Sequence, residues 1–376
     1  MDIGLVAGEA SGDLLGAHFI RALQQHHPQL SAAGIAGPQL VAAGVEALYP
    51  SDKLAVNGYV EVLRHLPELL RIRSRMGNYF LQQRPRVFVG IDAPDFNFAL
   101  EHKLKASGIP TVHFVSPSLW AWRPERIHTI REAVSHMLVV FPFEEGIYRD
   151  AGIPVTYVGH PLADVIPLEP DTAAARAALN LALGPVFALL PGSRLSEVKR
   201  HAALMLDAAQ LIQQRHPDAQ FVLPAASPAA AALVEQARAG RVLNLTVLAG
   251  QSHTALAACD VALVASGTAT LETALFKKPM VITYRVPALT GWLMQRQALL
   301  PWVGLPNILA REFLVPERIQ QAATPQILAA DALAWLADAP RRESVIARFR
   351  AMHLELKQHA AVRIANALAP YLETAR

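Results

Sequence analysis

The sequence predicts an α/β protein made of two Rossmann-like, doubly wound domains that face each other across a cleft. Apolar, β-rich runs alternate with helical patterns along the whole chain, which is typical of parallel sheets. A glycine-rich loop directly follows an apolar strand in each half, at 8–13 and at 191–194. The length of 376 residues is enough for two domains that each bury a core.

The first domain is expected over residues 1–168. It begins with the strand 3–6, whose glycine loop can present backbone N–H groups to an anion at a helix N-terminus. Three prolines within 159–171 interrupt both periodicities and predict the domain boundary there. Further strands of this domain are expected at 87–91, 111–115, 137–140 and 155–158.

The second domain is expected over residues 169–340. It starts with an Ala-rich helix and the strand 186–190, which leads into the second glycine loop. The remaining segment, 341–376, reads as helical and is expected to cross back toward the first domain. Further strands of the second domain are expected at 221–223, 245–248, 261–264 and 280–283.

Composition limits the possible classes of protein. Mean hydropathy is high at +0.25, yet no apolar run approaches the ~18 residues that span a bilayer. The first residues lack signal-peptide features, so a cytoplasmic location is expected. A net charge of +3 with clustered Arg and His favours phosphates or an anionic surface over nucleic acid. The single cysteine, Cys259, excludes an internal disulfide and is expected in the core.

The second half contains candidate phosphate-binding loops. The sequence has no G-x-G-x-x-G, P-loop, D-x-D or metal-ligand pattern, so backbone amides, helix dipoles and arginine must hold any phosphate. Arg194 follows the turn Gly192-Ser193 and can clamp a diphosphate, although a helix start with a surface arginine is the alternative. The loop at 266–272 opens another helix, and its alternative is a capping box. Its expected ligand groups are Ser266, Gly267, Thr268 and Thr270, with Glu272 accepting ribose hydroxyls.

The first half contains candidate acid–base groups. Asp92 and Asp95 follow the apolar strand 87–91, at the carboxyl end of a sheet where open α/β folds place their sites. An aspartate there can act as a general base on a hydroxyl, or it can cap a turn or helix. Glu9 and Ser11 in the first loop leave the same two readings open, because Ser-Gly-Asp is typical of a helix start.

Six blocks give the chain a specific resemblance to the lipid A disaccharide synthase family. They occur in order over nearly the whole sequence, and the two departures are Ala10, where Thr is expected, and Gly304, where Ser is expected. The blocks are VAGEASGD at 6–13, GIDAPDFN at 90–97, SPSLWAWR at 116–123, LLPGSR at 189–194, ASGTATLE at 265–272 and LPN at 305–307.

The resemblance implies an inverting, metal-independent GT-B glycosyltransferase without a cofactor. It would join UDP-2,3-diacylglucosamine to 2,3-diacylglucosamine 1-phosphate on the cytoplasmic face of the inner membrane, giving a β-1,6 tetraacyl disaccharide 1-phosphate and UDP; a homodimer is compatible with it. By carry-over, Asp92 is the candidate base ahead of Asp95 and Glu9. Arg194 and Asn307 lie at the UDP and phosphate end. Residues Ser11, Trp120, Trp122 and Arg123 are assigned to the acceptor cleft.

Two other functions remain open at this point. Another UDP-GlcNAc-using GT-B enzyme, either a muramyl-type transferase or an epimerase, would share the second-half loops without needing acyl chains. A non-enzymatic carrier of a lipid or nucleotide sugar would bind the donor without releasing UDP. The Asp92 block argues against the carrier, because a carrier needs no base.

The amphiphilic segment 59–76 is a candidate membrane contact. Its apolar residues cover an arc of roughly 180°, wider than the ~100° stripe that faces a core, and arginines lie opposite. Such a helix suits an anionic leaflet, and ordinary core packing is the alternative. The residues expected at the membrane are Val62, Leu66, Leu69, Leu70, Arg71 and Arg73.

Overall fold

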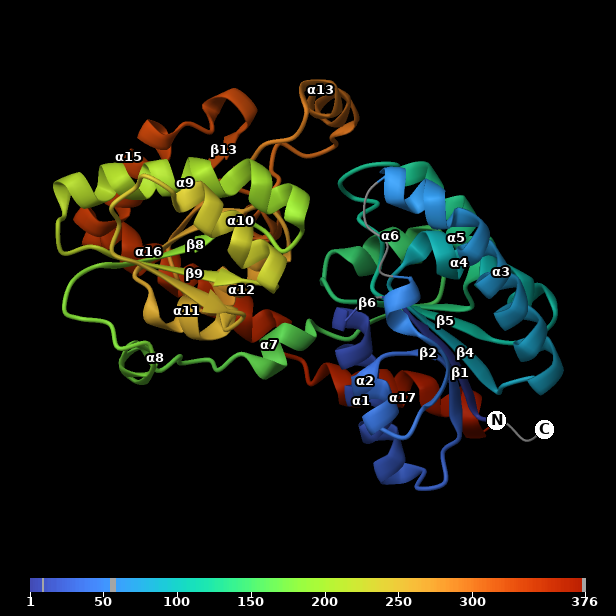
Figure 1. Ribbon diagram of the computed structural model, residues 1–376. Helices are drawn as coiled ribbons and strands as arrows, with labels where there is room; N and C mark the ends of the chain where they lie inside the picture. The colour runs from blue at the N-terminus through green and yellow to red at the C-terminus, as the bar shows by residue number, and fades with distance from the viewer. Residues whose placement is uncertain (9, 55–58, 374–376) are drawn as a thin grey trace. The chain divides into compact units, whose positions relative to one another are not determined.

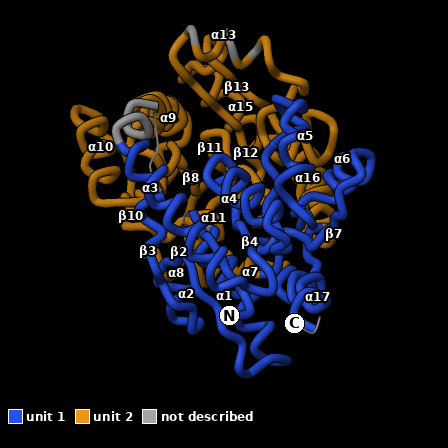
Figure 2. The backbone as a smooth tube through the Cα atoms, turned by 90° about the vertical axis from the view of Figure 1, so that its right-hand side faces the viewer, with its two compact units in different colours: residues 1–164, 356–376 blue, residues 165–355 orange. Residues whose placement is uncertain are grey.

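The structure is a computed structural model that describes residues 1–8, 10–54 and 59–373. It divides into two compact units, residues 1–164 with 356–376 and residues 165–355 (Figure 2). The first division falls slightly before the expected boundary at 168/169. The expected crossing segment is itself divided between the units. Helix α16 (Ala339–Leu356) lies almost entirely in the second unit, and α17 (Ala360–Glu373) lies in the first.

The first unit contains a seven-stranded parallel sheet with the order β3-β2-β1-β4-β5-β6-β7 (Figure 1). Chain order reverses between the neighbours β1 and β4, and this switch point is where open α/β sheets bind ligands. The strands are β1 (Ile3–Ala7), β2 (Ala32–Ala36), β3 (Glu46–Pro50), β4 (Val87–Ile91), β5 (Thr111–Phe114), β6 (His136–Val139) and β7 (Val155–Tyr157).

Helices cover both faces of this sheet. Their bounds are α1 (Ala10–His26), α2 (Pro38–Ala42), α3 (Tyr59–Gln83), α4 (Pro94–Ala106), α5 (Ile127–Ala133), α6 (Glu144–Asp150) and α7 (Pro161–Val165), together with α17.

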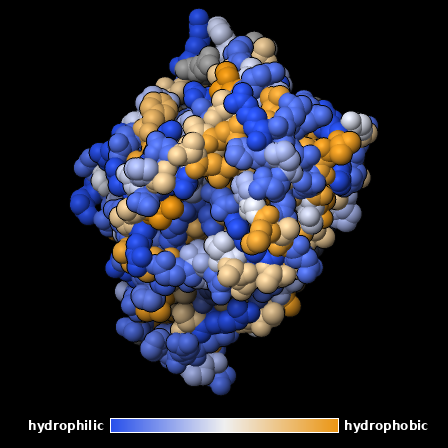
Figure 3. Space-filling model, turned by 90° about the vertical axis from the view of Figure 1, so that its left-hand side faces the viewer, coloured by the Kyte–Doolittle hydropathy of each residue, from blue (hydrophilic) through white to orange (hydrophobic). Residues whose placement is uncertain are grey.

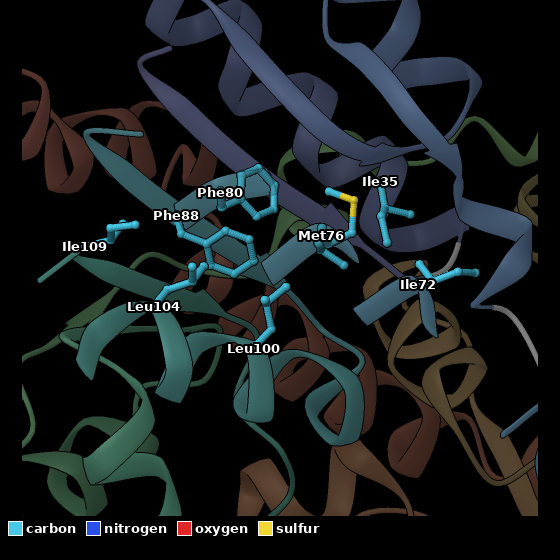
Figure 4. Packing of buried hydrophobic residues seen from close by; sticks show 9 residues of the cluster. Ile35, Ile72, Met76, Phe80, Phe88, Leu100, Leu104 and Ile109 are labelled. Carbon is cyan, nitrogen blue, oxygen red and sulfur yellow. The ribbon is translucent and has the colours of Figure 1, made fainter. Parts of the chain in front are cut away.

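Part of the apolar stripe of helix α3 packs in the core of the first unit. Ile72, Met76 and Phe80 are buried against β4 and α4 (Figure 4). The Phe80 ring meets Phe88 of β4 edge-on at 5.2 Å between centroids. The earlier turns of α3 differ, because Leu66 is exposed there. The apolar stripe of α3, which is continuous in the sequence pattern, is therefore buried in the core at later turns and exposed to solvent at Leu66.

The second unit repeats the architecture with a six-stranded parallel sheet in the order β10-β9-β8-β11-β12-β13. The switch point lies between β8 and β11. The strands are β8 (Val186–Leu190), β9 (Gln220–Ala225), β10 (Leu245–Ala249), β11 (Val261–Ala265), β12 (Met280–Tyr284) and β13 (Glu317–Ile319). The helices are α8 (Thr172–Ala178), α9 (Leu195–Arg215), α10 (Pro228–Arg238), α11 (Ser252–Ala258), α12 (Thr268–Leu275), α13 (Ala288–Gln297), α14 (Leu305–Ala310), α15 (Pro325–Ala337) and α16.

The end of the chain completes the first unit, where α17 packs on α1. The Asp164 carboxylate accepts hydrogen bonds from the backbone N–H groups of His359 at 3.0 Å and Ala360 at 2.6 Å. Arg363 donates to the carbonyl of Tyr157 at 3.1 Å. Because these bonds join positions about 200 residues apart, α17 is an integral part of this unit.

Two expectations from composition can be checked directly. Cys259 is fully buried in the second unit, and burial raises the pKa of its thiol to about 12, as expected for a core cysteine. No helix in the described part of the chain combines the length and the apolar character needed to cross a membrane.

Candidate active site

The predicted loops of the first unit meet at the switch point of its sheet. Ala7, the last residue of β1, pairs in register with Ile91, the last residue of β4. The loops that follow these strands approach so closely that a Cβ atom on Gly8 would lie 2.4 Å from Cβ of Ala93. Gly8 and Ala93, which follow these two strands, are therefore neighbours at the carboxyl edge of the sheet.

Asp92 has a backbone that is fixed on both sides. Asp92 and Ala93 both adopt the left-handed conformation, with φ of 53° and 46°. The Asp92 N–H donates to the carbonyl of Phe114 at 2.9 Å, and Asn97 Nδ2 donates to the Asp92 carbonyl at 2.8 Å. Two successive non-glycine residues at positive φ store strain, which concentrates at functional sites. The half-buried Asp92 carboxylate takes no part in these backbone bonds.

Asp95 has a different environment, at the start of α4. Its side chain is 91% exposed and forms an ion pair with Arg126 at 2.7 Å. Its carbonyl accepts a hydrogen bond from Arg73 Nη1 at 3.3 Å. Arg73, which we expect at a membrane, thus joins α3 to the α4 backbone, and its membrane contact stays a prediction.

A buried polar cluster that the sequence analysis missed underlies the Asp92 loop. Glu101 of α4 and His113 of β5 are fully buried, and Glu101 Oε1 lies 2.7 Å from His113 Nδ1. Burial raises the pKa of Glu101, and His113 opposes that effect. Asn97 is also fully buried. A Cβ atom on Gly90 would lie 2.1 Å from Glu101 Oε1, so only glycine fits there. One sequence feature could have revealed this cluster: helical periodicity places the charged residue Glu101 on the buried face of α4.

Trp120 is half-buried and helps to hold the loop after β5. Its Nε1 donates to Glu144 Oε1 at 3.0 Å, and its ring meets Phe143 edge-on at 5.4 Å. Glu144 also accepts from the Phe141 N–H at 3.0 Å, and burial raises its pKa to about 7. These contacts fix the position of Trp120 in its loop, and its assignment to the acceptor cleft stays a prediction.

Trp122 and Arg123 remain accessible in the same segment. Trp122 is exposed, and the Arg123 guanidinium lies 4.6 Å from the centroid of the Trp122 ring. Their assignment to the acceptor site stays a prediction. Glu9 lies outside the described residues, as do the side chains of Ser11 and Val62.

The Gly192–Arg194 loop follows β8 at the switch point of the second unit. Gly192 has φ of 112°, and a Cβ atom there would lie 2.4 Å from Glu197 Oε2. Arg194 is the N-cap residue of α9, and its Nη1 lies 3.4 Å from Glu197 Oε1. Ser193 is exposed, and the Arg194 side chain is about half exposed. The loop therefore caps the helix and still presents a guanidinium that an anion can reach.

The loop at 266–272 follows β11, beside β8 in the sheet. Gly267 has φ of 147° and ψ of −164°, a region essentially restricted to glycine, and it precedes the first turn of α12. Gly267 and Thr268 are exposed, so this helix N-terminus is open to an anion. Ser266 donates to the carbonyl of Val303 at 2.9 Å. Glu272 lies 3.4 Å from His253 Nε2.

Thr270 and Asn307 are buried supports of these loops, which corrects their expected contact with the nucleotide. The Thr270 hydroxyl donates to the Gly267 carbonyl at 2.8 Å and accepts from the Leu305 N–H at 3.2 Å. Asn307 is fully buried and exchanges two hydrogen bonds with the Val315 backbone at 2.9 and 3.0 Å. Their polar atoms are thus occupied within the protein.

Glu317 orders the segment that precedes α14. Its carboxylate accepts hydrogen bonds from the N–H groups of Val303 and Gly304, both at 2.9 Å, and from Asn307 Nδ2 at 2.9 Å. A Cβ atom on Gly304 would lie 2.2 Å from Cδ1 of Ile282. The departure from the family pattern at Gly304 therefore fits this protein, because its packing leaves no room for a serine.

His201 is a second buried group that the sequence analysis missed. Its Nε2 accepts a hydrogen bond from the Arg285 N–H at 2.9 Å, so Nδ1 carries the proton toward the Pro191 carbonyl at 3.2 Å. His201 therefore links the Gly192 loop to the end of β12. Because both partners are backbone atoms, no sequence pattern identifies this link.

Comparisons with known proteins give one consistent family. The family model described as lipid-A-disaccharide synthetase matches residues 3–369. A lipid-A-disaccharide synthase from Thiobacillus denitrificans is 71% identical over 372 residues, covering 99% of this chain and 100% of that protein. The crystal structure of UDP-GlcNAc 2-epimerase from Neisseria meningitidis bound to UDP-GlcNAc is similar in fold, with a TM-score of 0.68, 14% identity and coverage of 98% and 100%. The calicheamicin glycosyltransferase CalG4 is also similar, with a TM-score of 0.61, 15% identity and full coverage of both chains at 100%.

Proposed function

We propose site roles for this chain from the premise that it belongs to the lipid-A-disaccharide synthetase family. It is a glycosyltransferase of GT-B fold that forms the lipid A disaccharide from a UDP-sugar and a sugar phosphate. The proposal adds that the donor is UDP-2,3-diacylglucosamine and the acceptor is 2,3-diacylglucosamine 1-phosphate. The products are then the β-1,6 tetraacyl disaccharide 1-phosphate and UDP.

The second unit is proposed to bind UDP. The observation that carries this assignment is that two glycine loops with an exposed helix N-terminus and an exposed arginine occur at its switch point. Gly267 and Thr268 offer backbone N–H groups and a helix dipole to the diphosphate. Arg194 adds charge-assisted hydrogen bonds and Glu272 accepts the ribose hydroxyls. Thr270 and Asn307 hold the loops in place.

The first unit is proposed to bind the acceptor and supply the base. In an inverting transfer the acceptor hydroxyl attacks the anomeric carbon from the face opposite UDP. The base is therefore not one of the residues that bind UDP. Asp92 is the proposed base, because it directly follows the central strand β4 at the switch point of the first unit and its backbone is fixed there. Trp122 and Arg123 are proposed to contact the acceptor.

A peripheral location on the cytoplasmic face of the inner membrane completes the proposal. Leu66 and Leu70 of α3 are exposed together with Arg71, which suits the boundary between acyl chains and anionic headgroups. Leu69 is half-buried between the two environments.

One assay separates this function from its rivals. UDP release is measured from UDP-2,3-diacylglucosamine with and without the acylated acceptor phosphate, in detergent and in excess EDTA. Release that requires the acceptor and persists in EDTA supports the proposed reaction. Equal turnover of unacylated UDP-GlcNAc would favour a muramyl-type transferase or an epimerase, and donor binding without release would favour a carrier.

A further inference from the structure

Three polar side chains lie in the interior of the first unit, beside the end of β4. We call them the Gly90 cluster, defined by Asn97, Glu101 and His113, all of which are fully buried. A Cβ atom on Gly90 would collide with Glu101 Oε1. It would also lie 3.1 Å from both Asn97 Cγ and His113 Nδ1. The three side chains therefore meet at one point, two residues before Asp92 in the chain.

Packing alone does not account for these polar groups. Hydrophilic side chains predominate on the face of the molecule in Figure 3, where water can satisfy them. In the Gly90 cluster, by contrast, Asn97 Oδ1, Glu101 Oε2 and His113 Nε2 make no hydrogen bond within the described part of the chain. Apolar side chains such as Leu100 and Leu104 of α4 are buried without the cost of an unsatisfied polar atom (Figure 4). The cluster is therefore explained better by a function than by stability.

The cluster joins the two elements that hold the backbone of Asp92. The Asp92 N–H donates to the Phe114 carbonyl at the end of β5 at 2.9 Å, and the Asp92 carbonyl accepts from Asn97 Nδ2 of α4 at 2.8 Å. Glu101 Oε1 of α4 and His113 Nδ1 of β5 share a hydrogen bond of 2.7 Å. These bonds form a closed frame, from β5 to Asp92, from Asp92 to α4, and from α4 back to β5. The frame opposes relaxation of residue 92 from its left-handed conformation at φ of 53°.

We infer that Asn97 is a positioning residue for the proposed base, and that the Glu101–His113 pair keeps α4 at the distance from β5 that this role requires. The inference rests on the proposed function, because it takes Asp92 as the base. Since Asn97 is fully buried, it acts through the backbone of Asp92 and not on the substrate. A base must stay within hydrogen-bond reach of the proton that it takes, so a displacement of about 1 Å can lower the rate of the chemical step by ~10²-fold.

Steady-state turnover of the full-length protein tests this role, with UDP release measured over a range of concentrations of both acylated substrates. Asn97→Leu keeps the size and branching of the side chain and removes its donor, so kcat should fall roughly 10- to 100-fold. KM for both substrates and the affinity for UDP should stay within about twofold of wild type. The matched control is Thr111→Val, which removes a buried hydrogen bond to the Ala133 carbonyl at the start of β5 and should keep the wild-type kcat.

Two further comparisons separate positioning from a general loss of structure. Without a base there is nothing for Asn97 to position, so adding Asn97→Leu to Asp92→Asn should leave the residual turnover unchanged within about twofold. Glu101→Leu breaks the bond between α4 and β5 and should lower kcat roughly tenfold. Glu101→Gln can still accept a hydrogen bond from His113 Nδ1, so it should restore kcat to within about threefold of wild type.

Melting temperature and UDP affinity report whether each variant is folded, and Asn97→Ala, which a helix tolerates well, takes the place of Asn97→Leu if the latter does not fold. Wild-type kcat in the Asn97 variant would overturn the inference. So would an equal fall in kcat when the Asn97 substitution is added to Asp92→Asn, because the defect would then be independent of the base. Failure of the proposed function is recognised separately: wild-type protein would release no UDP in response to the acylated acceptor, and the inference would fall with it.

Discussion

The Asp92→Asn substitution tests the proposed base with little disturbance of the fold. Asparagine tolerates the left-handed conformation that residue 92 adopts at φ of 53°, whereas alanine would add strain of ~1–2 kcal/mol. The bond from Asn97 is made to the backbone carbonyl of residue 92, so it survives the change. An amide cannot take the proton of the acceptor hydroxyl. Turnover should therefore fall by roughly 10²- to 10⁴-fold, or ~3–5 kcal/mol of transition-state stabilisation.

Asp95→Asn is the matched control three residues away. The side chain of Asp95 is 91% exposed, and its one ion pair, with Arg126, is at the surface. Surface ion pairs contribute ~0.2–1 kcal/mol. If the substitution raised the activation free energy by this whole amount, turnover would fall by no more than about fivefold. The two aspartates thus differ in expected effect by at least an order of magnitude.

The assay is UDP release from detergent-dispersed substrates under saturating conditions, with UDP affinity and melting temperature measured on each variant. Near-wild-type turnover of Asp92→Asn would refute the assignment. So would a larger defect in Asp95→Asn with intact nucleotide binding, which would move the base to that residue or to Glu9.

Three more predictions follow from the contacts. Arg194→Ala should weaken UDP binding by ~1.5–3 kcal/mol in calorimetry with little change in melting temperature, and unchanged affinity would remove Arg194 from the site. Burial raises the Glu144 pKa from 4.5 to about 7, so the native state keeps a proton that the unfolded chain releases. The free energy of unfolding should then fall by about 3 kcal/mol as pH rises from about 4.5 to 7, and urea titrations of Glu144→Gln should lack this component; identical pH profiles would contradict it. Gly90→Ala should lower stability by ~1–3 kcal/mol in urea, because its Cβ would lie 2.1 Å from Glu101 Oε1, and an unchanged midpoint would show that the buried pair can move.

The sequence predicted the fold well where strands are strongly apolar. The central strands on both sides of each switch point, such as β4 and β11, occur where the pattern placed them. Strands β2, β3 and β13 were not predicted. β2 consists of alanine and glycine with one isoleucine, and β13 has only three residues. Their strand conformation comes from pairing with neighbours, which no local propensity reveals.

The sequence predicted the positions of the loops at the candidate site better than the contacts of their individual side chains. Glycine spacing located the turns at 192 and 267, because both adopt a φ that favours glycine. Spacing could not separate Thr268, which is exposed, from Thr270, which is buried two residues later. The direction of a side chain in such a loop depends on partners far along the chain, and the roles of Asn307 and Glu101 depend on tertiary contacts in the same way.

The return of the chain to its first unit has a consequence for biosynthesis. The Asp164 bonds and the packing of α17 on α1 require the last helix, so a nascent first unit cannot be completed until nearly all of the protein has been made. The second unit is contiguous and ends at residue 355. At the ~5–20 residues per second of translation, the apolar face of α1 therefore waits for roughly 17–70 seconds before its partner α17 has been made. On the ribosome, the second half of this polypeptide can finish folding before the first.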